Sequence, residues 1–194
     1  MQEFIFKMID DDTYAAMSYQ GDAAVVEVPA TYGGKPVTVL YDELFKGHTE
    51  ITEVILHDTV LCLGGFLFDG CTNLKTLRLP ESLTDMWQYC FVRSSIEIIE
   101  IPGSVTSIIP HTFEDCKSLT AVICHKGLKK IYKDAFKGCE NLAMVAVPSE
   151  TQVSHEAFEG CPRINPELKG KLIATCQCPK CRPVKGLRPF KPQA

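Results

Sequence analysis

Hydrophobic residues recur along this chain with a period of 22 or 23 residues. Phenylalanine marks the period most clearly, at positions separated by 23, 23, 22, 23 and 22 residues: Phe45, Phe68, Phe91, Phe113, Phe136 and Phe158. A fixed period of this length is the signature of a solenoid, in which each repeat forms one turn of a coil. The repetition therefore predicts the fold before any local preference for helix or strand is considered.

A second apolar pattern follows each phenylalanine. In the clearest copy Leu74, Leu77 and Leu79 lead into Pro80, and the last two leucines are two residues apart. Residues spaced by two point to one side of a strand, so we expect a short strand in every repeat with its apolar side chains facing the coil interior. Each strand would then pair with the equivalent strand of the next turn.

The remaining positions complete the turn of the coil. An apolar pair precedes five of the six phenylalanines by eight and five residues, as Val60 and Leu63 precede Phe68, whereas only Val153 remains in register before Phe158. The third repeat is one residue shorter, because Ile96 follows Phe91 by five residues where the second repeat has six. Since the pattern resumes after this deletion, we expect the coil to continue through it.

Polar residues with one apolar residue stand just before several of the phenylalanines, as in 41–44 and 132–135. We expect one turn of 3₁₀- or α-helix at these positions, started in the fourth repeat by Pro110. Glycines that would end these turns as C-caps follow two residues after the phenylalanine: Gly47, Gly70, Gly138 and Gly160.

The pattern Phe-x-Gly-Cys-x-x-Leu-x-x-Leu-x-Leu-Pro, spelled by residues 68–80, with a Val-x-x-Ile step after it, resembles the BspA-like leucine-rich repeat family. The resemblance covers about Thr13 to Ile164. It implies a leucine-rich-repeat solenoid of the α/β horseshoe type, rich in β-structure. It also implies an interaction or adhesion scaffold with diverse partners, of a kind common in surface and gut-associated bacterial proteins.

The chain divides into three predicted parts. Residues 1–24 contain two strands, 3–9 and 14–19, around an Asp10-Asp11-Asp12 turn, and we expect this hairpin to cap the open end of the coil. Residues 25–166 form an array of about five to six repeats. Residues 167–194 contain prolines, cysteines and basic residues outside the repeat pattern, and we expect them to form a flexible tail.

Charge differs sharply between the tail and the rest of the chain. The net charge of -4 conceals seven basic residues and no acid in 168–194, against 13 basic and 24 acidic residues in 1–167. The tail could therefore dock on the acidic body of a neighbour, which would make the protein a structural or self-associating module. We do not expect nucleic acid binding, because Phe190 is the only aromatic residue of the tail.

Nothing in the sequence predicts a membrane span, since no stretch approaches 18 consecutive apolar residues. The apolar run at Phe4-Ile5-Phe6 is also too short, and too close to acidic residues, for a secretory signal. We therefore expect a soluble, cytoplasmic protein.

Most of the ten cysteines fit the repeat as small buried side chains. Four stand three residues after the phenylalanine, and Cys124 replaces an inward leucine: Cys71, Cys116, Cys139 and Cys161. Three more form a cluster in the tail, Cys176, Cys178 and Cys181, where Cys-Pro-x-Cys resembles half of a zinc knuckle. For this cluster a zinc site, a redox-sensitive or incidental group of thiols, and plain disorder remain open, and we expect no other cofactor.

The outward residues of the predicted strands give a candidate binding surface. Read across turns they form two columns, and several members are apolar where a solvated face would be polar. The candidate partner-binding residues are Ile55, Arg78, Ile98, Glu100, Ala121, Ile123, Met144 and Ala146. A protein partner, a second copy of this chain, or the chain's own tail could cover this surface.

Catalysis is not expected. The histidines fall at different repeat positions, and two of them replace the proline of the strand-end turn: His48, His57, His111, His125 and His155. No Ser-His-Asp arrangement, glycine-rich phosphate loop or paired metal-ligand motif is present. The sequence therefore predicts a non-catalytic scaffold that binds a protein of unknown identity through its outward strand face, with self-association as the alternative.

Overall fold

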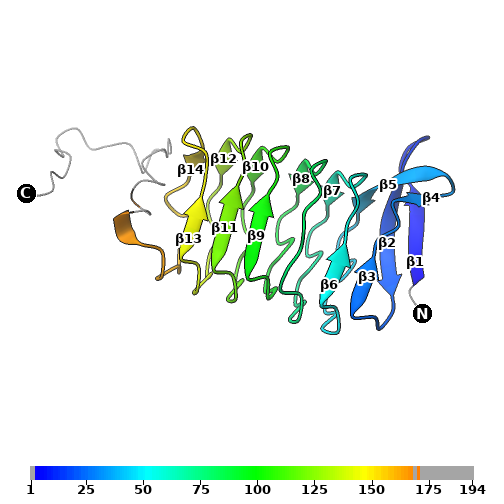
Figure 1. Cartoon of the computed structure of the whole chain (residues 1–194), viewed down its shortest axis with the longest axis horizontal. Helices are drawn as coiled ribbons and strands as arrows, with labels where there is room; N and C mark the ends of the chain where they lie inside the picture. The colour runs from blue at the N-terminus through cyan, green and yellow to red at the C-terminus, as the bar shows by residue number, and fades with distance from the viewer. Residues whose placement is uncertain (1–2, 168–169, 171–194) are drawn as a thin grey trace, which may run out of the picture.

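Two series of short strands run along the length of the molecule, one on each side of a flattened coil (Figure 1). The computed structural model describes residues 3–167 and residue 170. The first series is β3 (Val25–Glu27), β6 (Glu53–Ile55), β9 (Ile98–Ile101), β11 (Ala121–Cys124) and β13 (Met144–Ala146). The second series is β5 (Lys35–Leu40), β7 (Cys62–Leu63), β8 (Asp85–Met86), β10 (Ser107–Ile108), β12 (Lys130–Ile131) and β14 (Gln152–Val153). We call the outward surface of the first series the strand face.

Equivalent strands of successive turns pair in parallel, as the sequence predicts. In the first series β3 pairs with β6, and β11 pairs with both β9 and β13. In the second series β5, β7 and β8 form one ladder and β10, β12 and β14 another. The molecule is therefore a β-solenoid in which each turn hydrogen-bonds to the next.

The N-terminal end of the array carries an antiparallel pair, β1 (Glu3–Met8) and β2 (Tyr14–Gln20). The turn between them is organised by Asp10, whose carboxylate accepts hydrogen bonds from the backbone N–H groups of Asp12 and Thr13 at 2.9 and 2.7 Å. Strand β2 then pairs in parallel with β5, and a short strand, β4 (Thr31–Tyr32), pairs antiparallel with β5. That this hairpin protects the end of the array stays a prediction.

The six repeat phenylalanines form a single file through the centre of the coil, and every one of them is fully buried. Successive rings are stacked, with centroids 4.9 to 5.7 Å apart and ring planes within 18° of each other. The first five of these phenylalanines, Phe45 to Phe136, also donate their backbone N–H to a carbonyl oxygen of the following turn. Phe113, for example, donates to Ala135 at 2.9 Å. Ring stacking and the backbone ladder therefore set one common spacing between turns.

A column of thiols lies beside the phenylalanine file, as predicted. The Sγ atoms of Cys71, Cys116, Cys139 and Cys161 each donate to the carbonyl oxygen of the phenylalanine one turn earlier, at 2.9 to 3.0 Å. All seven described cysteines are free thiols. Burial raises the pKa of the Cys71 thiol to about 12, and burial alone has the same effect on Cys124. The column acts as packing, and the Cys71 and Cys124 thiols remain protonated at neutral pH.

The prediction of helical turns before each phenylalanine is wrong. The residue two positions before the phenylalanine has a left-handed backbone in five successive turns, with φ between 55° and 65°: Glu43, Phe66, Tyr89, His111 and Asp134. A right-handed helix requires negative φ at consecutive residues, so one such residue ends it. These segments are tight turns instead, closed by bonds such as Lys46 N–H to Glu43 O at 3.0 Å.

Replacing Phe113 with alanine should strongly destabilise the protein, because the ring is fully buried between two stacked neighbours. We expect the free energy of unfolding to fall by about 3 to 5 kcal/mol, measured by urea denaturation. Phe66→Ala is the matched control, since Phe66 is only partly buried. Equal losses in the two variants would show that the central file is not the main source of stability.

Replacing Asp115 with glycine should stabilise the protein. Asp115 has φ of 56° at the position where four other turns have glycine with positive φ. Removing the Cβ relieves a left-handed conformation, so we expect the free energy of unfolding to rise by roughly 0.5 to 1 kcal/mol. Lys117→Gly in the same turn, where φ is not positive, should lower it. A thermal melt of the two variants distinguishes these effects, and a loss of stability in Asp115→Gly would contradict the prediction.

Candidate functional site

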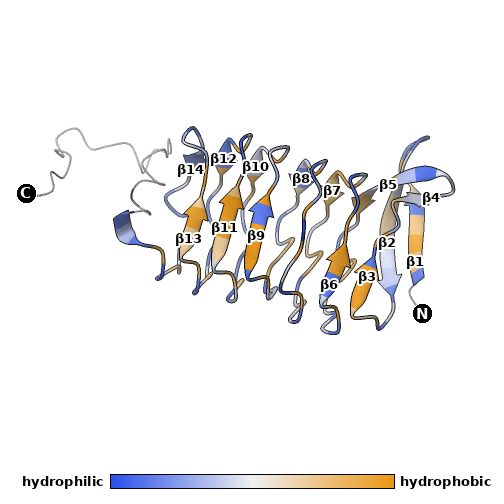
Figure 2. Cartoon of the chain, in the orientation of Figure 1, coloured by the Kyte–Doolittle hydropathy of each residue, from blue (hydrophilic) through white to orange (hydrophobic). Residues whose placement is uncertain are grey.

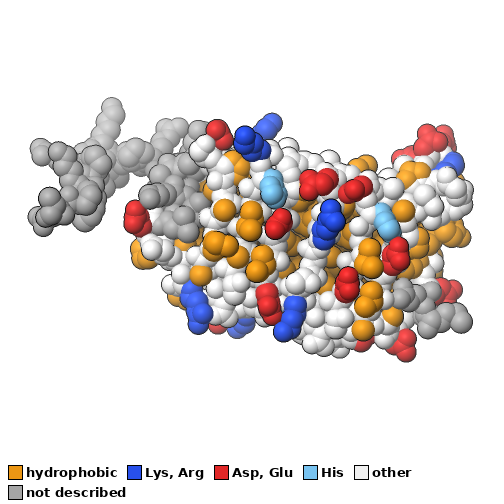
Figure 3. All heavy atoms as spheres, in the orientation of Figure 1, with side chains coloured by type: hydrophobic (Ala, Val, Ile, Leu, Met, Phe, Trp, Pro, Cys, Tyr) orange, Lys and Arg blue, Asp and Glu red, His pale blue; other side chains and the backbone are white. Residues whose placement is uncertain are grey.

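Across β9, β11 and β13 the outward columns predicted from the sequence are present on the strand face. Ala121 lies between Ile98 and Met144, and Ile123 lies between Glu100 and Ala146, in the register of β9, β11 and β13. Ile98 and Met144 are each 50% exposed. Apolar strands follow one another along this side of the molecule (Figure 2), and apolar side chains reach its surface (Figure 3).

Not every predicted residue contributes to this surface. Ala121 is only 5% exposed, because its small side chain lies between those of Ile98 and Met144 on the neighbouring strands. Ile123 is partly buried, and Ala146 is exposed. The exposed part, which we call the apolar patch, consists of Ile98, Ile123, Met144 and Ala146.

The ladder of the strand face is interrupted between β6 and β9. The intervening turn carries the clearest copy of the repeat, yet its pairing is limited to a single bridge from Thr76 to Ile98. Leu77 and Leu79 still point into the core, with 6% and 5% exposure. The segment thus keeps its hydrophobic anchors but loses its backbone ladder.

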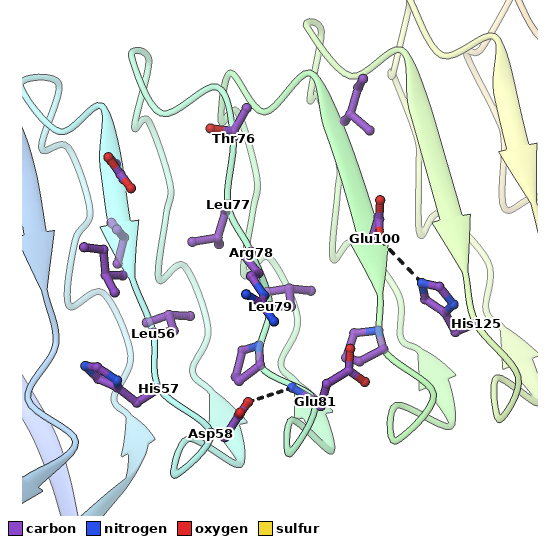
Figure 4. Close-up of a pocket in the computed structure, with 16 residues that line it drawn as sticks. Leu56, His57, Asp58, Thr76, Leu77, Arg78, Leu79, Glu81, Glu100 and His125 are labelled. Carbon is purple, nitrogen blue, oxygen red and sulfur yellow. Dashed lines mark hydrogen bonds and ion pairs between the residues drawn. The ribbon is translucent and has the colours of Figure 1, made fainter.

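A groove of about 700 Å³ lies over this interruption. Its walls come from four successive turns, and the close-up in Figure 4 shows Arg78 near the middle, with His57 on one side and His125 on the other. The phenylalanine file is also least parallel here, since the planes of Phe45, Phe68 and Phe91 differ by 18° and 15°, against 5° to 10° in later turns. The groove therefore lies beside the turns whose phenylalanine rings are least parallel.

The groove is lined by charged side chains of both signs. Arg78 is exposed and has no ion-pair partner among residues 3–167. His57 Nε2 lies 3.0 Å from Glu27 Oε1, and His125 Nε2 lies 3.5 Å from Glu100 Oε2. Four acidic residues contribute to the lining: Glu53, Asp58, Glu81 and Glu100.

The five histidines do not gather at one site, although His57 and His125 both line the groove. Each of the five lies beside a glutamate, at separations of 2.5 to 3.5 Å between ring nitrogen and carboxylate oxygen: His48, His57, His111, His125 and His155. The hydrogen bond from His48 is the largest cause of a lowered pKa at Glu50. Three of these pairs are local in sequence, and His57–Glu27 and His125–Glu100 join adjacent turns. Such separate pairs are the arrangement of structural surface contacts.

Metal binding was predicted, as one of three alternatives, for Cys176, Cys178 and Cys181. These residues lie outside the described part of the chain. Within the part that is described, no group of three or more His, Cys, Asp or Glu side chains is arranged to hold a metal ion. Among the same residues, no helix has the length and apolar character that crossing a bilayer requires.

Two surface features were missed by sequence reasoning. The first is the groove, for which the nearest sequence signal is the residue lost between Phe91 and Ile96. The second is a partly buried stack outside the central file, where Phe66, Tyr89 and His111 lie with ring centroids 4.8 Å apart. These three residues occupy one repeat position, so their periodicity could have revealed the stack.

Comparison with solved structures supports the fold. A T. pallidum leucine rich repeat protein is 26% identical over 86% of this chain and 90% of its own, with a TM-score of 0.66. A leucine-rich repeat protein from Bacteroides ovatus, 20% identical, matches 85% of this chain and 51% of its own with a TM-score of 0.68. A search of the curated proteins found no match.

The family model for the BspA type leucine rich repeat region matches residues 38–165 in six copies. This span contains all six repeat phenylalanines, the apolar patch and the groove. The chain belongs to the BspA-type leucine-rich repeat family.

Proposed function

We propose that this protein is a non-catalytic scaffold that binds a protein partner through the strand face. The observation that carries this proposal is the apolar patch, in which Ile98 and Met144 are each half exposed on a paired sheet. Outward positions of a strand can be occupied by polar residues without disturbing the core. Contiguous apolar side chains at such positions therefore favour a surface that another molecule covers. Membership of a repeat family of interaction scaffolds supports the same function.

The backbone beneath the patch favours binding without rearrangement. Strands β9, β11 and β13 are tied by parallel ladders, and the core side chains beneath them, such as Ile99 and Val122, are at most 1% exposed. A surface whose backbone is already fixed loses little conformational entropy when it binds. The affinity then depends mainly on how well a partner covers the apolar side chains.

Non-catalytic action is supported by the chemistry of the described residues. The histidines form separate pairs with glutamates, and burial raises the pKa of several thiols, including Cys71 and Cys124. A thiol kept protonated is a poor nucleophile. Recognition of a partner is therefore the better use of this surface.

Introducing lysine at both Ile98 and Met144 should reduce partner recovery from extracts of the native cell by at least about tenfold, because two apolar contacts become charges. Ile5→Lys is the matched control, since Ile5 is 55% exposed but lies on β1. Quantitative mass spectrometry of captured proteins provides the measurement, and circular dichroism checks the fold. Unchanged recovery with an intact fold would remove the patch from consideration.

Self-association is a second candidate, favoured by the opposite charges of residues 1–167 and 168–194. The basic segment lies almost wholly outside the described residues, so its docking on a neighbour stays a prediction. Light scattering of the full chain should then show an oligomer that dissociates as salt rises from about 0.05 to 0.5 M, because screening shortens the range of charge attraction. A mass that is independent of salt would contradict charge-driven assembly.

A further inference from the structure

We propose that the groove between β6 and β9 is a docking site for an extended segment of a partner protein that is rich in lysine and arginine. This inference rests on the proposed function and names the chemistry of the partner at one part of the strand face. The groove is distinct from most of the apolar patch, since Ile98 is the one residue of the patch that lines it. The two surfaces adjoin along β9.

The open backbone of the groove supplies hydrogen-bond acceptors. Residues 77–80 follow the single bridge at Thr76 and are paired with neither β6 nor β9 in the described structure. The Pro80 carbonyl already accepts from the Leu83 N–H at 3.1 Å. The carbonyl groups of 77–79, which lack a ladder partner, remain available to a ligand at a solvent-facing surface. Arginine and lysine side chains carry donors only, so they match a surface of free carbonyls and carboxylates.

The spacing of the turns determines how a segment would lie. Ring centroids are 5.7 Å apart from Phe45 to Phe68 and 5.2 Å apart from Phe68 to Phe91. Inserting a strand would require about 9.6 Å between its two neighbours, which is twice the ordinary strand separation. A partner therefore cannot enter the ladder and must lie on top of the face, where side chains make most of the contacts.

The charge of the lining favours a cationic segment. Four carboxylates face one guanidinium around the groove, and Glu53 and Glu81 have no cationic partner among residues 3–167. The rest of the body has the same sign, with 24 acidic and 13 basic residues in 1–167. Such a field attracts cations from a distance and repels acidic chains.

A substitution at Arg78 tests whether the bound segment is positively or negatively charged. A cationic segment would bind the carboxylates despite Arg78, so removing that charge should strengthen binding. An acidic segment would instead need Arg78 as its main contact, because a guanidinium binds carboxylates in a bidentate manner. The two classes of ligand thus predict opposite effects of one substitution.

The experiment uses the full chain and a labelled peptide of alternating arginine and serine, with fluorescence anisotropy as the readout at low salt. Two further peptides replace arginine with glutamine or with glutamate. Glu53→Gln combined with Glu81→Gln removes two of the four carboxylates that line the groove, and Glu3→Gln combined with Glu159→Gln removes the same charge from exposed sites elsewhere. A third variant is Arg78→Gln.

We expect the arginine peptide to bind, and the groove variant to weaken it by about fivefold or more, since each exposed ion pair contributes a modest factor. The remote variant should change the dissociation constant by less than about twofold, and Arg78→Gln should tighten binding by about two- to threefold. Neither control peptide should bind.

Three results would overturn the proposal. Equal losses of affinity for the arginine peptide in the groove and remote variants would mean that the peptide is attracted to the acidic body as a whole and not to the groove. Binding of the glutamate peptide that Arg78→Gln abolishes would assign the groove to an acidic segment. If replacing the basic residues of 168–194 with glutamine tightens peptide binding, the occupant is this chain's own tail. The scaffold function is judged separately with Met144→Lys alone, because Met144 does not line the groove and loss of partner in that variant stands whether or not the groove binds the peptide.

Discussion

The stacking of one phenylalanine on the next is the interaction on which the rest of the structure depends. Each ring fills the centre of its turn, and a spacing near 5 Å between rings matches the separation of hydrogen-bonded strands. The two spacings must agree, because the ring and the strands belong to the same turn. A repeat too small to form a core alone is thereby stabilised by both of its neighbours.

The same constraint explains which features the sequence could predict. The phenylalanine file, the inward leucines and the thiol column all follow from side chains that recur at a fixed interval. The third repeat is one residue shorter before Ile96, yet its apolar residues still face the core. Ile96, Ile99 and Ile101 are each at most 1% exposed. Burial was predictable because an apolar side chain in a stacked turn has few other places to go.

Backbone conformation in the turns was less predictable. Four of the six residues that stand two positions after a phenylalanine are glycines, which favour a left-handed backbone. In the structure the other two, Arg93 and Asp115, have positive φ as well. Arg93 is held there by a bidentate pair with the buried carboxylate of Asp69, at 2.7 and 3.0 Å. Two residues before the phenylalanine, however, the side chains share no preference for positive φ, so their sequence indicated a helical turn instead.

The groove shows why a surface is harder to infer than a core. Residues 68–80 match the repeat pattern best, yet their strand is the one that loses its ladder on the strand face, beside the two phenylalanine pairs whose ring planes differ most. How neighbouring turns pack on one another is not written in any single repeat. A regular core therefore coexists with an irregular surface, and the interruption exposes backbone and charge that a complete ladder would hide. In a coil whose interior is nearly the same in every turn, such local departures are what distinguish one part of the face from another.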